Sequence, residues 1–343
     1  MTRRSKKGYA MGMAIETAYN TYKAPTVFAR YTKSGLNVEP TDEDLDICDG
    51  VPGSKYMYRK QAEVGGTTEL PAWPEGALEQ ILKLVFGSAT STIIGTGPGY
   101  RHVFTQDWDA ILSASLTQWI PGFSGSEEVE AFTGAVISSL EIGYDGPGPI
   151  TLKVTWDCGG FDAAQSAPTR SYTTAAPFVW GNFTAEIDQV LKTDVTKASL
   201  KIDRAVDKLY GATGDTKTAL LPNIMTPTDW LVTGSLQFPK ENRDYLMEYL
   251  SGSSSGTTLD TIIAEKELQL TCTGATIETT NKYLMDFKMP LVNMSKCSND
   301  KDSDKAILYD IDYAARYFDG VDAGLGTNCI LGGEVVSKLV SIT

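Results

Sequence analysis

Alternating hydrophobic and polar positions run through much of the chain and predict a protein built mainly from β-strands. The clearest cases are two pairs of long segments, each joined by a short polar stretch: residues 130–144 with 150–156, and residues 261–277 with 282–293. Successive side chains of a strand point to opposite faces, so such a segment buries one face and leaves the other in water. We expect both pairs to form long hairpins.

Shorter segments rich in β-branched and aromatic residues predict further strands, and two segments with helical spacing predict helices. The strands are expected at residues 26–31, 56–64, 100–105, 113–119, 178–183, 197–203, 229–237 and 306–318, and the helices at residues 76–86 and 243–250. The first helix has one apolar stripe at i, i+3, i+4 and i+7, made by Leu78, Ile81, Leu82 and Val85. It should pack against a sheet on that face only and end at Gly87.

The two halves of the chain share one order of expected elements: strand, strand, helix, long strand pair. Residues 33–38 (KSGLNV) are echoed by residues 197–202 (KASLKI), and residues 132–137 (FTGAVI) by residues 272–277 (CTGATI). Longer loops after the first helix absorb the difference in spacing. We interpret the pattern as a duplicated β-rich unit, in which residues 133–135 should superpose on residues 273–275.

The duplication predicts two domains, each of which is large enough in a chain of 343 residues to bury its own core. The expected organisation is a basic N-terminal arm at residues 1–12, a first domain at 13–160, a polar, strandless linker at 161–176, a second domain at 177–319 and a C-terminal tail at 320–343 that docks on another part. A repeated unit of this kind indicates a building block that associates symmetrically with copies of itself.

Composition agrees with a soluble globular protein, since 42% of the residues are hydrophobic and 21% are charged. No stretch approaches the roughly 18 apolar residues of a membrane span, so we expect neither a signal peptide nor a membrane anchor. The net charge of −13 argues against tight binding of nucleic acid, which depends mainly on lysine and arginine. Five widely spaced cysteines without a C-x-x-C pair predict free thiols and folding in the cytosol.

Four motifs formally match a functional site, and each lacks a part that its chemistry requires. Residues 252–256 (GSSSG) match a nucleophile elbow but follow a helix, and the single histidine, His102, precedes them. Residues 42–46 and 300–304 open like calcium loops but lack the turn glycine and the final glutamate, so they are read as solvated acidic loops (39–49 and 299–304). Residues 95–99 (GTGPG) lack the third glycine of a dinucleotide-binding loop and the lysine of a P-loop.

We therefore expect no catalytic, cofactor-binding or metal-binding residue, and no enzyme. His102 is read as a strand residue whose ring is hydrogen-bonded. Residues 95–99 and 252–256 are read as turns. Whether two of the many acidic residues form a carboxylate pair suited to glycoside hydrolysis stays an open question, because their geometry is not visible in the sequence.

Several segments resemble tail tube proteins of long-tailed bacteriophages, of the type with a duplicated tube domain. They are residues 12–26 (GMAIETAYNTYKAPT), 130–134 (EAFTG), 138–141 (SSLE) and 232–236 (VTGSL), and the resemblance covers most of the chain. The sequence departs from the family pattern at Asn20, where glycine is common.

The resemblance implies two tandem tube-like β-sandwich or half-barrel domains, each with one flanking α-helix. It implies rings of six domains around a large central β-barrel, hence a homotrimeric pseudo-hexamer or alternatively a homohexamer, stacked into a tube that conducts double-stranded DNA during ejection. The implied partners are the tape measure, tail terminator and tail-tip proteins. The implied location is the virion tail, after synthesis and assembly in the host bacterial cytoplasm. The two long hairpins are the expected channel wall, and the acidic loops belong at ring contacts or on the outside.

Two other functions remain alternatives. A tail-tip adhesin or carbohydrate-binding β-sandwich would gather aromatic side chains on one face, whereas the six tryptophans are scattered along the sequence: Trp73, Trp108, Trp119, Trp156, Trp180 and Trp230. A β-rich hydrolase of the cell wall would require an acid pair, and nothing in the sequence singles one out.

Overall fold

The protein is mainly β, as predicted, with two α-helices among the residues that the structure describes. The structure is a computed structural model and describes residues 10–45, 56–95, 97–121, 127–163, 165–166, 169–211, 220–239, 244–251, 265–278, 281–299, 308–320 and 329–342. The first half contains β1 (Ala10–Ile15), β2 (Val27–Ala29), β3 (Lys33–Ser34), β4 (Asn37–Leu45), β5 (Tyr56–Pro71), α1 (Ala77–Phe86), β6 (Gly87–Ile93), β7 (Tyr100–Gln106), β8 (Ala114–Pro121), β9 (Glu127–Asp145), β10 (Thr151–Asp157) and β11 (Gly160–Asp162).

The second half adds the remaining strands and the second helix. They are β12 (Phe183–Ile187), β13 (Val190–Lys192), β14 (Lys197–Leu209), β15 (Ile224–Pro239), α2 (Asp244–Ser251), β16 (Glu265–Glu278), β17 (Asn281–Asn299), β18 (Leu308–Ala315) and β19 (Gly332–Ser337). The two predicted long hairpins are confirmed as the antiparallel pairs β9–β10 and β16–β17. Both predicted helices are confirmed within one residue at each end.

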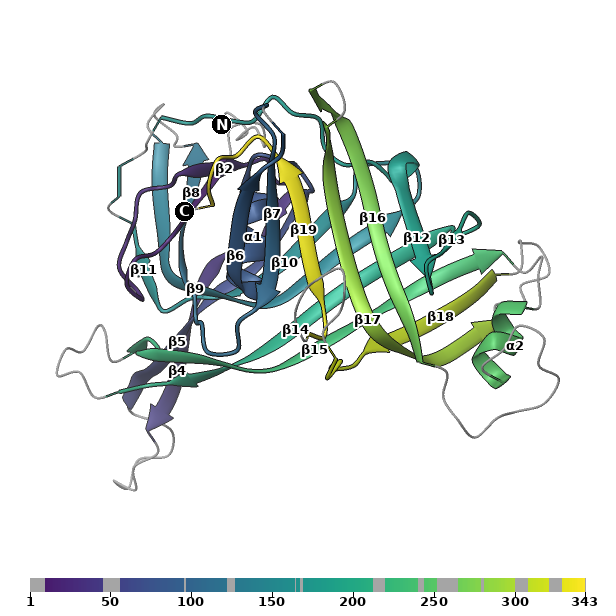
Figure 1. Cartoon of the computed structure of the whole chain (residues 1–343). Coiled ribbons are helices and arrows are strands. Elements are labelled where there is room, and N and C mark those ends of the chain that lie inside the picture. The colour runs from purple at the N-terminus through teal and green to yellow at the C-terminus, as the bar shows by residue number, and fades with distance from the viewer. Residues whose placement is uncertain are drawn as a thin grey trace, which may run out of the picture.

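Eight strands form one antiparallel sheet, which we call the long sheet. Its order is β4–β5–β10–β9–β14–β15–β18–β17, with β3 beside β5 as a first segment of the β4 edge. Two covering sheets lie on one side of it, β2–β1–β8–β9–β11 and β13–β12–β16–β17–β19–β7–β6 (Figure 1). The strands β9 and β17 begin in a covering sheet and end in the long sheet. The long sheet does not close on itself within the chain.

The two halves have the same strand connectivity. The neighbours β4–β5–β10–β9–β8 in the first half correspond to β14–β15–β18–β17–β16 in the second, and a helix follows the second strand of each set. The ladders also carry a bulge at the same place, between Thr155 and Trp156 opposite β9, and between Met294 and Lys296 opposite β18. The residues after the first helix that the sequence predicted as longer loops form the β6–β7 hairpin.

This topology corrects one expected correspondence between the halves. Residues 133–135 lie on β9, whose counterpart is β17, whereas residues 273–275 lie on β16, the counterpart of β8. The two Thr-Gly-Ala sequences therefore do not superpose, since strand pairing rather than shared letters defines the repeat. Residues 33–38 and 197–202 do correspond, because Lys33 pairs with Glu69 of β5 and Lys197 with Gln237 of β15 at matching positions.

The helix α1 is enclosed by its surroundings. This corrects the expectation that it packs against a sheet only through its apolar stripe. Its predicted apolar stripe is buried, but so are Glu79, Gln80, Leu84 and Phe86. The reason is that several elements surround the helix: it contacts β1, β2, β6, β7 and β9, Gln80 donates a hydrogen bond to the hydroxyl of Thr26, and the ring of Phe86 packs against that of Phe104 on β7. Figure 1 shows β6 and β7 passing over α1. The helix ends as predicted at Gly87, which has a left-handed φ of 86°.

Other local expectations need correction. Residues 39–45 of the expected acidic loop form strand β4, which pairs with β5 along its length, and the exposed side chains of Asp42 and Glu43 contact Arg59 and Lys60 on β5. The Ser- and Thr-rich segment after α1 forms the edge strand β6. In place of a strand at 178–183, a 3₁₀ turn (Trp180–Asn182) precedes β12. The expected linker begins within β11, and the expected arm ends within the buried strand β1.

The segment that carries the family resemblance holds a buried carboxylate. Glu16, just after β1, accepts hydrogen bonds from the hydroxyls of Ser113 (2.6 Å) and Ser115 (2.7 Å) and from the backbone N–H groups of Gly134 and Asn20 (both 2.9 Å). A buried carboxylate needs such partners to offset its lost hydration. Glu16 thus ties the end of β1 to β8 and β9.

Candidate functional site: the polar face and open edges of the long sheet

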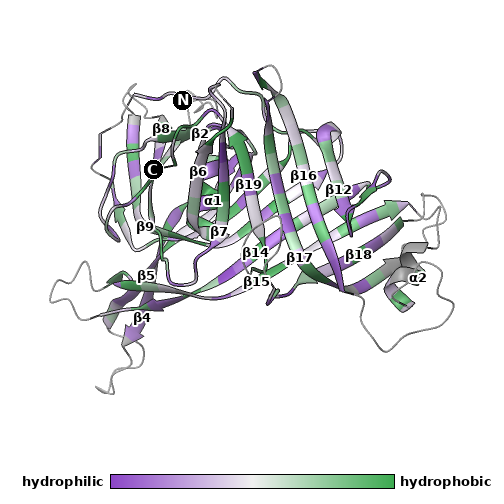
Figure 2. Ribbon diagram, viewed as in Figure 1, coloured by the Kyte–Doolittle hydropathy of each residue, from purple (hydrophilic) through white to green (hydrophobic). Residues whose placement is uncertain are grey.

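The long sheet has one apolar and one polar face. Along β9 the side chains of Leu140, Ile142 and Tyr144 are buried under the covering sheets, whereas those of Glu141 and Asp145 point the other way. The same alternation continues along the other strands, and it is visible along β14 as bands of opposite hydropathy (Figure 2). We call the uncovered side the polar face.

Charged residues dominate the polar face. Its acidic residues, which outnumber its lysines, are Glu39, Glu63, Glu69, Glu141, Asp145, Asp157, Asp203, Asp310 and Asp312, and its lysines are Lys33, Lys153, Lys197, Lys201, Lys208 and Lys296. Positions directly opposite one another in a ladder share a face, which assigns these residues to one surface.

Five of these lysines each contact a carboxylate on the same face. The pairs are Lys33–Glu69 (3.5 Å), Lys153–Glu141 (3.5 Å), Lys197–Asp145 (2.9 Å), Lys201–Asp203 (2.7 Å) and Lys208–Asp157 (2.6 Å). The pairs other than Lys208–Asp157 are exposed, and exposed pairs add little to folding stability. Their effect is electrostatic, because a lysine beside a carboxylate offers little net positive charge to a passing phosphate.

The long sheet has an open edge at each end. Among the described residues, strands β3 and β4 pair only with β5. In the same part of the chain, the second half of β17 (residues 294–299) pairs with β18 on one side and with no strand on its other side. An unpaired edge presents backbone N–H and C=O groups that readily add another strand. The molecule therefore carries two edges suited to association.

Exposed apolar side chains gather at two matching hairpin ends. Met57 of β5 is 70% exposed beside Tyr56 and Tyr58, and Leu209 of β14 is 57% exposed close to Ile224 of β15. Both ends project from the same end of the molecule (Figure 1). Clusters of exposed apolar residues commonly mark interaction surfaces.

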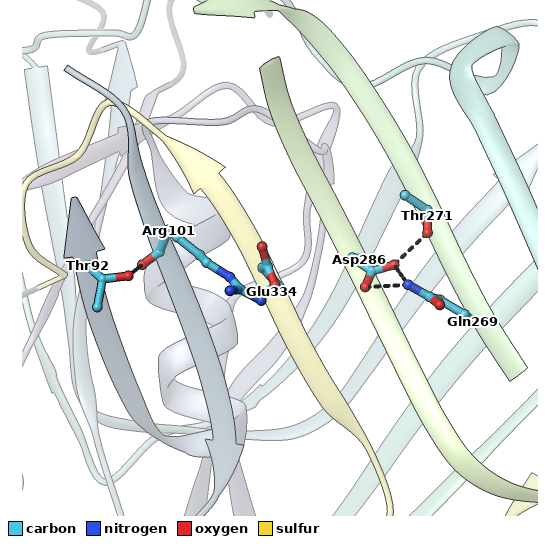
Figure 3. Close-up of polar contacts among 6 residues, drawn as sticks. All are labelled: Thr92, Arg101, Gln269, Thr271, Asp286 and Glu334. Carbon is cyan, nitrogen blue, oxygen red and sulfur yellow. Dashed lines mark hydrogen bonds and ion pairs between the residues drawn. The ribbon is translucent and has the colours of Figure 1, made fainter. Parts of the chain in front are cut away.

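A second polar surface lies on the outer side of the covering sheet. There Arg101 of β7 donates a hydrogen bond to Glu334 of β19 (2.5 Å), and Asp286 of β17 accepts hydrogen bonds from Thr271 (2.5 Å) and Gln269 (2.9 Å) (Figure 3). Burial raises the pKa of Asp286, and the two hydrogen bonds partly offset this. Arg101, Gln269, Asp286 and Glu334 line a depression of about 420 Å³. Its charges are satisfied by neighbouring side chains.

The structure also places the other residues that the sequence singled out. His102 lies on β7 with its ring nitrogens 2.8 Å from the hydroxyl of Ser91 and 3.2 Å from that of Ser337, so its expected hydrogen bonding is confirmed, and burial lowers its pKa. The described part of residues 95–99 connects β6 to β7. Residues 46, 252–256 and 300–304 lie outside the described part of the chain.

Within the described part, no three His, Cys, Asp or Glu side chains gather in a way that would hold a metal ion. Cys158, Cys272 and Cys297 are free thiols. Sequence reasoning missed the polar face because its members are spread over eight strands. The sequence shows the alternation of polar and apolar residues along each strand. It does not show the order in which the strands pair.

Comparison with known families decides what this architecture is. Residues 9–315 match the family model of the phage tail tube protein. The chain belongs to this family. A search among curated proteins gives no match.

The chain is thus a structural subunit of a phage tail tube and a component of the virion tail. Membership of the family also implies self-assembly into a tube. None of the helices in the described part of the chain is long and apolar enough to cross a membrane.

Proposed function

We propose that three chains join side by side into a ring, in which their long sheets form one closed β-barrel around a channel for double-stranded DNA. The observation that carries this proposal is the internal β9–β14 junction. There the first unit of the chain joins the second, edge to edge, within one sheet. Repeating this junction between chains supplies both open edges with partners, and six units in a ring require three chains.

The polar face lines the channel in this proposal. A barrel wall has an inner and an outer face, and the covering sheets and α1 already occupy the apolar face of the long sheet. The acidic excess and the paired lysines suit a passage that must not retain DNA. Of the two hairpins expected to form the wall, β9–β10 keeps this role, whereas β16 and the first half of β17 belong to the outer layer.

Stacking of rings uses the exposed apolar hairpin ends. They occupy matching places in the two units, so a ring of three chains would carry six of them on one side. When unlike ends of two rings meet, each added ring leaves a further end free. Stacking therefore continues and builds an open tube. In this account the protein has no catalytic step. Its further partners are the tape measure, tail terminator and tail-tip proteins, and assembly takes place in the host bacterial cytoplasm.

Electron microscopy of the purified protein tests this proposal. Rings or striated tubes with a central hole are the expected result. Compact monomers at every concentration would overturn it.

A further inference from the structure

We propose that β3 and β4 of one chain add to the open edge of β17 in a second copy of this chain, in the register of the internal β9–β14 junction. In that register Val38 lies opposite Cys297, and Glu39 lies opposite Lys296. This inference rests on the proposed ring, and it adds the residues that make the contact between chains.

The repeat fixes which residues correspond on the β4 side. Glycines at matching places, Gly66 and Gly234, pack against the backbone oxygens of Gly35 and Ser199, respectively. These contacts align residues 33–38 with 197–202, so that Val38 corresponds to Ile202 and Glu39 to Asp203.

The shared bulge fixes the β17 side. Across it, Ser139 pairs with Thr155 in the first unit, and Lys296 pairs with Asp312 in the second. Lys296 therefore corresponds to Ser139, and Cys297 to Leu140.

The internal junction then gives the contacts to expect between chains. Within the chain Ile202 lies opposite Leu140, and both are buried. Asp203 lies opposite Ser139 and accepts a hydrogen bond of 2.7 Å from its hydroxyl. At the junction between chains the same two positions hold an apolar pair, Val38 with Cys297, and an ion pair, Glu39 with Lys296.

The side chains at these edges are suited to the contact. Glu39 and Lys296 are exposed and carry opposite charges, and Val38 and Cys297 are each partly buried against the core. Directly opposite residues of an antiparallel pair have Cα atoms about 4.5–5.5 Å apart, within the range that a disulfide spans. Inside one chain the two edges lie seven strand spacings of about 4.8 Å apart along the long sheet, too far for a disulfide.

Cysteine cross-linking of assembled rings tests the register. Val38→Cys rings, treated with a mild oxidant, should give covalent dimers and trimers on a non-reducing gel, through the native Cys297. Wild type and the double variant Val38→Cys/Cys297→Ser should give none. Asn37→Cys is the matched control, because its side chain points to the other face and should not react with Cys297.

Charge reversal provides a second readout. Glu39→Lys and Lys296→Glu should each lower the fraction of protein in rings, and the double variant should restore it. Three-chain rings that show neither cross-linking of Val38→Cys nor rescue by the double variant would overturn the register and leave the proposed function intact. Cross-linking from Asn37→Cys in place of Val38→Cys would overturn it as well. Absence of rings in the wild type would instead overturn the proposed function.

Discussion

Gly66 and Gly234 hold the same position in the two units of the chain, and neither has room for a side chain. A Cβ atom on Gly66 would lie 2.1 Å from the backbone oxygen of Gly35, and one on Gly234 would lie 2.1 Å from that of Ser199. Real Cβ atoms do not come so close to backbone oxygens, so the second strand of each unit requires glycine here. The shared requirement is a physical mark of the repeat.

Gly66→Ala and Gly234→Ala should each destabilise the protein by more than about 2 kcal/mol, because neighbouring backbone must move to admit the methyl group. Gly66 also has a φ of 139°, which disfavours alanine further. Denaturant unfolding measures the loss. Gly148→Ala is the control, since nothing lies within 4 Å of its Cβ position. If Gly234→Ala unfolds at the same denaturant concentration as this control, the shared packing requirement is refuted.

Glu79→Gln should change how stability depends on pH. Burial in α1 raises the pKa of Glu79 to about 7, although the backbone N–H groups of Glu75 and Gly76 donate to its carboxylate. Between pH 4.5 and 7 the folded protein therefore binds more protons at Glu79 than the unfolded chain does. This contribution to stability falls as pH rises through that window.

Glutamine does not titrate, so the stability of Glu79→Gln relative to wild type should improve between pH 5 and pH 8, by up to about 3 kcal/mol. Chemical denaturation at both pH values measures the difference. Glu63→Gln, which removes a carboxylate at an exposed position, is the control substitution. If wild type and Glu79→Gln differ in free energy of unfolding by the same amount at both pH values, the raised pKa of Glu79 is contradicted.

Asp145→Asn should make assembled rings retain DNA. The substitution frees Lys197, and a ring of three chains would present three freed lysines to one duplex. Binding of a short duplex should then weaken with salt at a log–log slope of about −2.7. Glu334→Gln is the matched control, because it frees Arg101 on the outer surface, where the three sites cannot reach one duplex. Equal binding by the two variants would argue against a channel lined by the polar face.

Met57→Glu combined with Leu209→Glu should block stacking and leave rings intact. Each substitution places a charge at an exposed apolar hairpin end, and burying that charge against the next ring is unfavourable. Sedimentation and electron microscopy distinguish rings from tubes. Val340→Glu provides the control, since Val340 is 66% exposed away from these ends. Normal tubes from the double variant would show that stacking uses another surface.

Local pattern was sufficient to predict the long hairpins and both helices. The stripe from Leu78 to Val85 and the cap at Gly87 are properties of a short segment, and the structure confirms them. The acidic strand β4 was missed because it forms by pairing with β5, a contact that a single segment does not reveal. The strand β6 was missed because its Ser- and Thr-rich sequence is typical of a loop.

The candidate site could not be predicted in the same way. Lys197 and Asp145 face each other only because β14 pairs with β9, a contact between the two units that no local pattern specifies. The repeat itself was inferred correctly from residues 33–38 and 197–202 but incorrectly from the Thr-Gly-Ala sequences. Short shared words arise by chance, whereas matching bulges and glycine contacts reflect how the strands pair.

The mass of a single ring tests the central claim most directly. Rings separated from tubes at low protein concentration can be measured by native mass spectrometry. A duplicated chain that supplies two of six units predicts a mass three times the 37.1 kDa of one chain. A ring of six chains, or a protein that stays monomeric when the edges of β4 and β17 are intact, would contradict the account.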